Sequence, residues 1–209
     1  MKKIILASGS PRRNRMLSRL GIPFIRMVVD SDEKNRADLS METFAQVAME
    51  NALAKARKAF EEIDSEEESV IIGADTIVVF GRDILPKPTD RNDARRMLKQ
   101  LSGKTHSVIT GIALVLSPHG KIFTDYEETK VTFRDLTNEE INLYVASNEP
   151  MDKAGAYGIQ GFAAFLVEKV EGDYPNVVGL PLLRLYNLMK KAGVDLFRLA
   201  IESSLGAKQ

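Results

Sequence analysis

The sequence contains no cysteine, which excludes disulfides, thiolate metal sites and cysteine nucleophiles and fits a reducing compartment. It contains only two histidines, His106 and His119. A Ser-His-Asp triad and a multi-histidine metal centre are therefore not expected. We expect both histidines at the surface or at strand ends.

The chain also lacks net charge, because 29 Lys plus Arg balance 29 Asp plus Glu. Without a strongly basic field, a dedicated nucleic-acid binder is not expected. Long apolar runs are missing too: the run from Ile4 to Ala7 is too short for a secretory signal, and no stretch approaches a membrane span. We therefore expect a cytoplasmic protein that does not bind membranes.

What is present is typical of a folded protein. Its 209 residues are 44% hydrophobic and 28% charged, which suits a real hydrophobic core. Strand and helix patterns alternate without a repeat or a linker, which predicts an α/β fold and a single elongated domain over residues 1–209, with a flexible tail at 203–209. The patterns predict strands at 4–7, 24–29, 70–80, 108–116, 121–133 and 165–170, and helices at 11–20, 40–60, 90–101, 137–146 and 180–192.

The first candidate site is the loop Ser8-Gly9-Ser10-Pro11-Arg12-Arg13, which joins a buried strand to a helix N-terminus. Free N–H groups and the helix dipole favour an anion there. Arg12 and Arg13 add bidentate donors for phosphate oxygens, and Ser8 offers a hydroxyl. The other interpretation is a capped helix with solvated arginines.

Asp75 is the strongest single candidate for a general base or a metal ligand. It interrupts two β-branched runs, so a buried strand carries an acid in its middle, which is costly without a purpose. The alternative is a carboxylate satisfied by neighbouring backbone N–H groups. Thr76 beside it either binds substrate or packs as a β-branched strand residue.

Three further charged residues have two interpretations each. Lys87 lies between Pro86 and Pro88, whose stiff backbone would aim its ammonium, although an exposed turn lysine explains it equally well. Glu33 is a candidate oxygen ligand for a hard cation or part of a solvated loop. Lys55 flanks the apolar face of the second helix, and its spacing does not decide where it points.

Gln160 lies in a glycine-rich segment, Gly155 to Gly161, that does not match the dinucleotide-binding pattern. Its side-chain amide carries both a donor and an acceptor, which suits a base edge. A polar turn residue bonded to local backbone is the other interpretation.

Taken together, these motifs resemble the Maf family of nucleoside triphosphate pyrophosphatases. The resemblance covers about residues 3–193 in order and is far more specific than any single motif. The segments that carry it are Leu6–Arg13, Gly73–Thr76, Lys87–Pro88, Leu101–Gly103, Asp152–Gly155, Tyr157–Gly161 and Asn176–Pro181.

The resemblance implies a mixed α/β fold related to the inosine triphosphate pyrophosphatases, with substrate in a cleft between two lobes. It implies metal-dependent hydrolysis to a nucleoside monophosphate and pyrophosphate. Arg12, Thr76 and Gln160 are similar to the subgroup that acts on dTTP and UTP. The physiological substrate, normal or modified, is left open, and a homodimer is common for such folds.

The expected site follows from this resemblance and from the chemistry of the residues. Asp75 serves as the base, and Glu33 helps it hold Mg²⁺ or Mn²⁺, with Asp75 contacting the metal, the water or both. The substrate-binding set is Ser8, Arg12, Arg13, Lys55, Thr76, Lys87 and Gln160. Two rival functions are a nucleotide-binding regulator of septum formation and cell division, and a phosphohydrolase that removes the γ phosphate.

Overall fold

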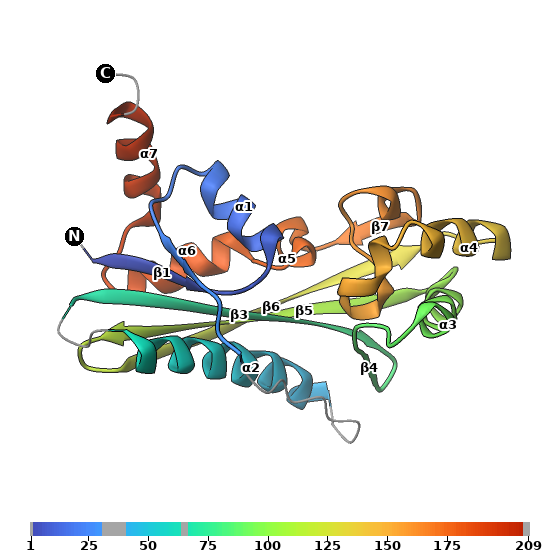
Figure 1. Ribbon diagram of the computed structural model, residues 1–209, viewed down its shortest axis with the longest axis horizontal. Helices are drawn as coiled ribbons and strands as arrows, with labels where there is room; N and C mark the ends of the chain where they lie inside the picture. The colour runs from blue at the N-terminus through green and yellow to red at the C-terminus, as the bar shows by residue number, and fades with distance from the viewer. Residues whose placement is uncertain (1, 31–40, 64–66, 207–209) are drawn as a thin grey trace.

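A computed structural model describes residues 2–30, 41–63 and 67–206 of the chain (Figure 1). One seven-stranded sheet has the order β2-β1-β3-β5-β6-β7, with β4 beside β3. Pairing is parallel among β1, β2 and β3 and antiparallel elsewhere, so the predicted α/β class with a mixed sheet is confirmed. The strands are β1 (Lys3–Ala7), β2 (Ile25–Met27), β3 (Ser69–Phe80), β4 (Asp83–Leu85), β5 (Thr105–Ser117), β6 (Lys121–Phe133) and β7 (Val167–Glu171).

Helices cover the two ends of this sheet differently, which gives the elongated molecule two lobes (Figure 1). In the first lobe, α2 lies on one face of the sheet and α1 and α6 lie on the other; α3, α4 and β7 build the second lobe. The helices are α1 (Pro11–Arg19), α2 (Met41–Glu62), α3 (Arg91–Leu101), α4 (Asn138–Ala146), α5 (Tyr174–Val178), α6 (Leu182–Lys191) and α7 (Leu196–Gly206), with short 3-10 turns η1 (Glu149–Asp152), η2 (Ala154–Ala156) and η3 (Phe162–Phe165).

The helix α2 packs unusually close to the sheet because both surfaces carry small residues. A Cβ atom at Gly73 of β3 would lie 2.0 Å from the carbonyl oxygen of Ala52, and one at Gly111 of β5 would lie 2.3 Å from that of Ala48. Ala48 and Ala52 are themselves fully buried. The backbone of α2 therefore rests directly on two adjacent strands, and its polar side chains can reach the sheet.

The long strand β3 passes from one lobe to the other, and its flanking strands change on the way. The parallel strand β1 pairs with it up to Gly73, and the short strand β4 pairs with it from Val78 onward. Between these points, β5 pairs with β3 on the other edge. Asp75 and Thr76 thus lie where one edge of β3 has neither of these two flanking strands beside it.

Several expectations need correction. The helix α7 packs Leu196 and Leu199 against the core and continues to Gly206, into the predicted tail at 203–209; residues 207–209 lie outside the described part of the chain, and the flexibility of the tail stays a prediction. The strand predicted at 24–29 is only Ile25–Met27. His106 is at a strand end as expected but is buried rather than at the surface: its Nε2 lies 2.7 Å from the Tyr157 hydroxyl, and burial lowers its pKa to about 4.

Replacement of Gly73 by alanine tests the close packing of α2. We expect Gly73→Ala to lower the free energy of unfolding by about 1–3 kcal/mol or more, because the new methyl group meets helix backbone that cannot rotate away. Gly9→Ala is the matched control, since a Cβ there would make an ordinary 3.5 Å contact with Val28. Urea unfolding measures both, and equal stability of the two variants would contradict the packing constraint.

Candidate active site

A cleft of about 420 Å³ opens beside the uncovered stretch of β3, between the two lobes. It brings together every predicted site residue that the structure describes, from segments far apart in the sequence. Glu33, the remaining predicted residue, lies outside the described residues. The predicted residues on the cleft wall are Ser8, Arg12, Arg13, Lys55, Asp75, Thr76, Lys87 and Gln160.

Asp75 is the buried carboxylate of the cleft, with 6% of its surface exposed. Its Oδ1 accepts from Lys55 Nζ at 2.6 Å, and its Oδ2 accepts from Asn51 Nδ2 at 3.0 Å. Both donors come from α2, where a spacing of four residues places them on one helix face. The close packing of α2 on the sheet therefore fixes the orientation of the Asp75 carboxylate.

Asn51 was not identified from the sequence, although it is buried and contacts Asp75 directly. Its spacing to Lys55 was the signal that could have found it. The structure also decides the position of Lys55, which the spacing to apolar residues left open: its ammonium points at Asp75.

Thr76 faces the opposite side of the sheet, because successive strand residues alternate. Its hydroxyl accepts from Arg13 Nη2 at 2.9 Å and shares a hydrogen bond with the Thr110 hydroxyl at 2.9 Å. Thr110 in turn donates to the backbone carbonyl of Asn176. A polar network thus fixes this face of β3 beneath the cleft.

Arg13 is almost fully buried, and its guanidinium joins three parts of the wall. Its Nε donates to the carbonyl oxygen of Gly179 at 2.6 Å, and its Nη1 donates to Ser8 Oγ at 3.2 Å. With the bond to Thr76, these contacts link the first loop, β3 and the turn after α5. The expected contact of Arg13 with phosphate stays a prediction, and its present partners give it a positioning role.

The first loop is fixed from two sides. The backbone N–H of Ser10 donates to Ser8 Oγ at 3.2 Å, and Arg26 of β2 donates to the carbonyl oxygens of Ser8 and Gly9. Ser10 occupies the N-cap position of α1, before Pro11. The N-terminus of a nine-residue helix therefore points into the cleft region from a rigid loop.

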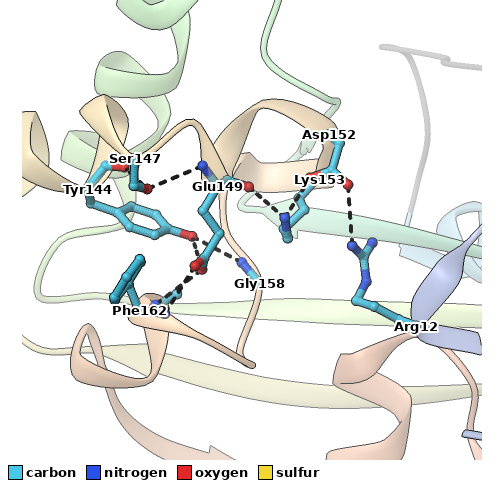
Figure 2. Close-up of polar contacts among 9 residues, drawn as sticks. Arg12, Tyr144, Ser147, Glu149, Asp152, Lys153, Gly158 and Phe162 are labelled. Atoms are coloured by element: carbon cyan, nitrogen blue, oxygen red, sulfur yellow. Dashed lines mark hydrogen bonds and ion pairs between the residues drawn. The ribbon is translucent and has the colours of Figure 1, made fainter. Parts of the chain in front are cut away.

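The second lobe contributes Asp152 and Lys153, which lie in the segment Asp152–Gly155 and for which the sequence predicts no role. Figure 2 shows Asp152 between two cations: its carboxylate lies 2.5 Å from Lys153 Nζ and 3.6 Å from Arg12 Nη1 of α1. Burial opposes ionisation of Asp152, but the Lys153 hydrogen bond and the two positive charges hold its pKa below the ordinary value. An ion pair therefore connects the lobes across the cleft.

Lys87 and Gln160 are exposed side chains on the cleft wall, from the segment after β4 and from the second lobe. The charges of the cleft are unbalanced although the whole chain is neutral. Among the residues that the structure describes, three carboxylates line it, Asp30, Asp75 and Asp152, against the cations Arg12, Arg13, Lys55, Lys87 and Lys153. The excess of positive charge suits a ligand with several negative charges.

The carboxylates of the cleft are also possible ligands of a divalent cation. Among the described residues, no group of three His, Cys, Asp or Glu side chains is placed to hold a metal ion. Mg²⁺ in nucleotide-hydrolysing sites is usually bound by one or two carboxylates together with substrate phosphates. The carboxylate of Asp75, which lies on the cleft wall, is of the kind that such a shared site uses.

The fold and the cleft define an α/β protein in which many cationic side chains line a cleft around one buried carboxylate. Comparison with known proteins identifies the family: the chain belongs to the Maf-like proteins, whose family model matches residues 3–192. No helix in the described ranges is long and apolar enough to cross a membrane.

Similar curated proteins cover nearly the whole chain. A dTTP/UTP pyrophosphatase from Acetivibrio thermocellus is 48% identical over 95% of this chain and 99% of its own length. One from Dictyoglomus thermophilum is 45% identical over 93% and 98%, and one from Alkaliphilus oremlandii is 50% identical over 88% and 93%. Among solved structures, a HAM1 protein from Coxiella burnetii covers 100% of both chains with 15% identity and a TM-score of 0.49.

Proposed function

We propose that this protein is a nucleoside triphosphate pyrophosphatase that hydrolyses dTTP and UTP to the nucleoside monophosphate and pyrophosphate. The observation that carries the proposal is the cationic cleft built around Asp75, in a chain without net charge. The names of the similar curated proteins support the same activity and the same substrates.

In the proposed reaction, water attacks the α phosphorus and Asp75 accepts its proton. The bond from the α phosphorus to the oxygen that bridges the α and β phosphates breaks, and pyrophosphate leaves with the electron pair of that bond. Asn51 and Lys55 hold the two oxygens of the Asp75 carboxylate, so a proton acceptor is presented in a fixed orientation. Lys55 also adds a positive charge next to the reacting phosphate.

The triphosphate is proposed to bind at the N-terminus of α1. Ser8 and the helix N–H groups offer donors, and Arg12 of α1 and Lys87 of the segment after β4 also line the cleft. Arg13 supports this arrangement by holding Ser8 and Thr76 in place. Charge that develops on the leaving pyrophosphate is thereby met by fixed donors.

A divalent metal fits this chemistry, and we propose Mg²⁺ or Mn²⁺. When bound, the cation neutralises phosphate charge and polarises the phosphoryl oxygens. Asp75 is the described residue proposed to hold it, and Glu33 is the second proposed ligand. A hard oxygen ligand set of this kind suits Mg²⁺ and Mn²⁺ better than softer metals.

Gln160 is proposed to select the nucleobase of the substrate, because its amide matches the donor and acceptor pattern of a uracil or thymine edge. Gln160 is exposed on the cleft wall, in a cleft that the loop Ser8 to Arg13 also lines. Thr76, directly after Asp75, belongs to the same subgroup pattern, and its hydroxyl helps to fix β3 through Arg13 and Thr110.

The proposal is tested with purified protein and a panel of normal and modified nucleoside triphosphates in Mg²⁺ or Mn²⁺, with the products identified by chromatography. We expect pyrophosphate and the monophosphate, with dTTP and UTP preferred over purine triphosphates. Release of orthophosphate would instead indicate γ-phosphate removal. Binding without turnover would favour a regulator that senses nucleotides.

Asp75→Asn tests the proton acceptor. We expect turnover of UTP to fall by roughly 10²–10⁴-fold, because the amide keeps the shape but accepts a proton poorly. Asp83→Asn, at an exposed position of β4, is the matched control and should keep full activity. Circular dichroism and thermal unfolding establish that the variant is folded; a folded Asp75→Asn protein with activity within a few-fold of wild type would remove Asp75 from this role.

Arg12→Ala and Lys87→Ala test the phosphate site. Each substitution should lower kcat/KM for UTP by an amount that corresponds to about 1.5–3 kcal/mol of lost transition-state stabilisation, the range for a charge-assisted hydrogen bond. The free energy of unfolding should change little. Arg82→Ala, in the exposed turn between β3 and β4, is the control for loss of a surface charge. If both cleft variants matched this control in steady-state kinetics, the phosphates would have to bind elsewhere.

A further inference from the structure

The segment that carries Gln160 is tied down by two side chains of the second lobe (Figure 2). Glu149 Oε2 accepts from the backbone N–H of Phe162 at 3.1 Å, and Oε1 accepts from that of Ala163 at 3.4 Å. At the other end of the segment, the Tyr144 hydroxyl accepts from the N–H of Gly158 at 3.3 Å. Glu149 and Tyr144 thus hold the backbone on both sides of Gln160.

The two holding groups are also bonded to each other. The Tyr144 hydroxyl donates to Glu149 Oε1 at 3.0 Å, and the phenol is 5% exposed. Burial, reinforced by the charge of Glu149, raises the pKa of Tyr144, so the phenol keeps the proton that it donates. The carboxylate, the phenol and three backbone N–H groups form one connected network, in which removal of one member leaves others unpaired.

The local backbone is shaped to admit this carboxylate. Gly161 has a φ of +88°, in the region that favours glycine, and a Cβ there would lie 2.7 Å from Glu149 Oε2. Gly161 therefore supplies both the turn after Gln160 and the space in which the carboxylate reaches Phe162. The glycine at position 161 and the position of the Glu149 carboxylate therefore depend on each other.

Glu149 reaches the cleft by a second, separate route. Its backbone carbonyl oxygen accepts from Lys153 Nζ at 2.6 Å, and Lys153 contacts Asp152, the partner of Arg12 (Figure 2). A side-chain substitution at Glu149 removes the contacts to the Gln160 segment and leaves this carbonyl in place. The two routes can therefore be separated by experiment.

We propose that Glu149 is a positioning residue for nucleobase selection, which, together with Tyr144, holds the segment from Gly158 to Ala163 so that Gln160 presents its amide to the base. The inference rests on the proposed function and deepens it. A segment flanked by Gly158 and Gly161 has high conformational freedom of its own. Ordering it before substrate arrives removes that entropic cost from binding of the matching base.

The test uses the full chain with Glu149→Gln, whose amide keeps the size of the side chain but replaces one acceptor oxygen with a donor. We expect the KM for UTP to rise roughly three- to tenfold and the ratio of kcat/KM for UTP over GTP to fall by the same factor, as expected for one lost hydrogen bond, with kcat nearly unchanged. Inhibition by inorganic tripolyphosphate, which has no base, should be unchanged. Amide hydrogen exchange at Phe162 should be faster than in wild type.

Three further variants complete the design. Tyr144→Phe and Gly161→Ala disturb the same network from other sides and should shift the UTP-to-GTP ratio in the same direction, so the test does not depend on the folding of one variant. Glu168→Gln, at an exposed position of β7, is the matched control and should behave as wild type. A merely structural role would weaken tripolyphosphate inhibition and lower kcat along with the ratio.

The outcomes separate the two proposals. If wild type does not prefer pyrimidine triphosphates, the proposed function fails before any variant is compared. If wild type prefers them but Glu149→Gln leaves the ratio unchanged while exchange at Phe162 accelerates, the function stands and the inference is overturned. Unchanged exchange at Phe162 would also overturn it, because the carboxylate would then not hold the segment.

Discussion

The contact of Lys55 and Asn51 with Asp75 depends on how closely α2 approaches the sheet. Glycines on two adjacent strands, Gly73 and Gly111, leave room for the helix backbone where any other residue would place a Cβ. Without this approach, the buried carboxylate of Asp75 would lose the two donors that it has from α2, which is unfavourable for a charged group. The stability of the sheet and the orientation of the proposed proton acceptor therefore share one steric constraint.

The position of the cleft follows from the strands. The long strand β3 continues through both lobes, while β1 pairs with it as far as Gly73 and β4 from Val78 onward. A rigid strand with a locally uncovered edge can present Asp75 to a ligand and still be held by β5 along its other edge. Its two faces have different tasks: Asp75 faces α2, and Thr76 faces the network of Arg13 and Thr110.

The cationic side chains of the site also differ from one another in burial and in the groups that they contact. Arg13 is buried and donates to Gly179, Ser8 and Thr76, so it joins three segments of the wall. Arg12 and Lys87 also line the cleft and are more exposed than Arg13. Arg13 thus lies toward the core, while its neighbour Arg12 lines the cleft and pairs with Asp152. Glu149 is an equivalent supporting group in the second lobe.

Much of this protein could be predicted from its sequence by local patterns. The acid inside an apolar run marked Asp75, and the strand patterns at 70–80, 108–116 and 121–133 predicted the strands β3, β5 and β6. Short-range periodicity and motif order carry such information because they depend on neighbours in the chain. Other features could be described only from the tertiary structure. They are the partners of Asp75, the burial of Arg13 and His106, the helical backbone at 203–206 and the network at Glu149. The contacts of Asp75, Arg13 and His106 join residues distant in sequence, and whether a polar side chain is solvated, buried or bonded is decided only when those segments pack together.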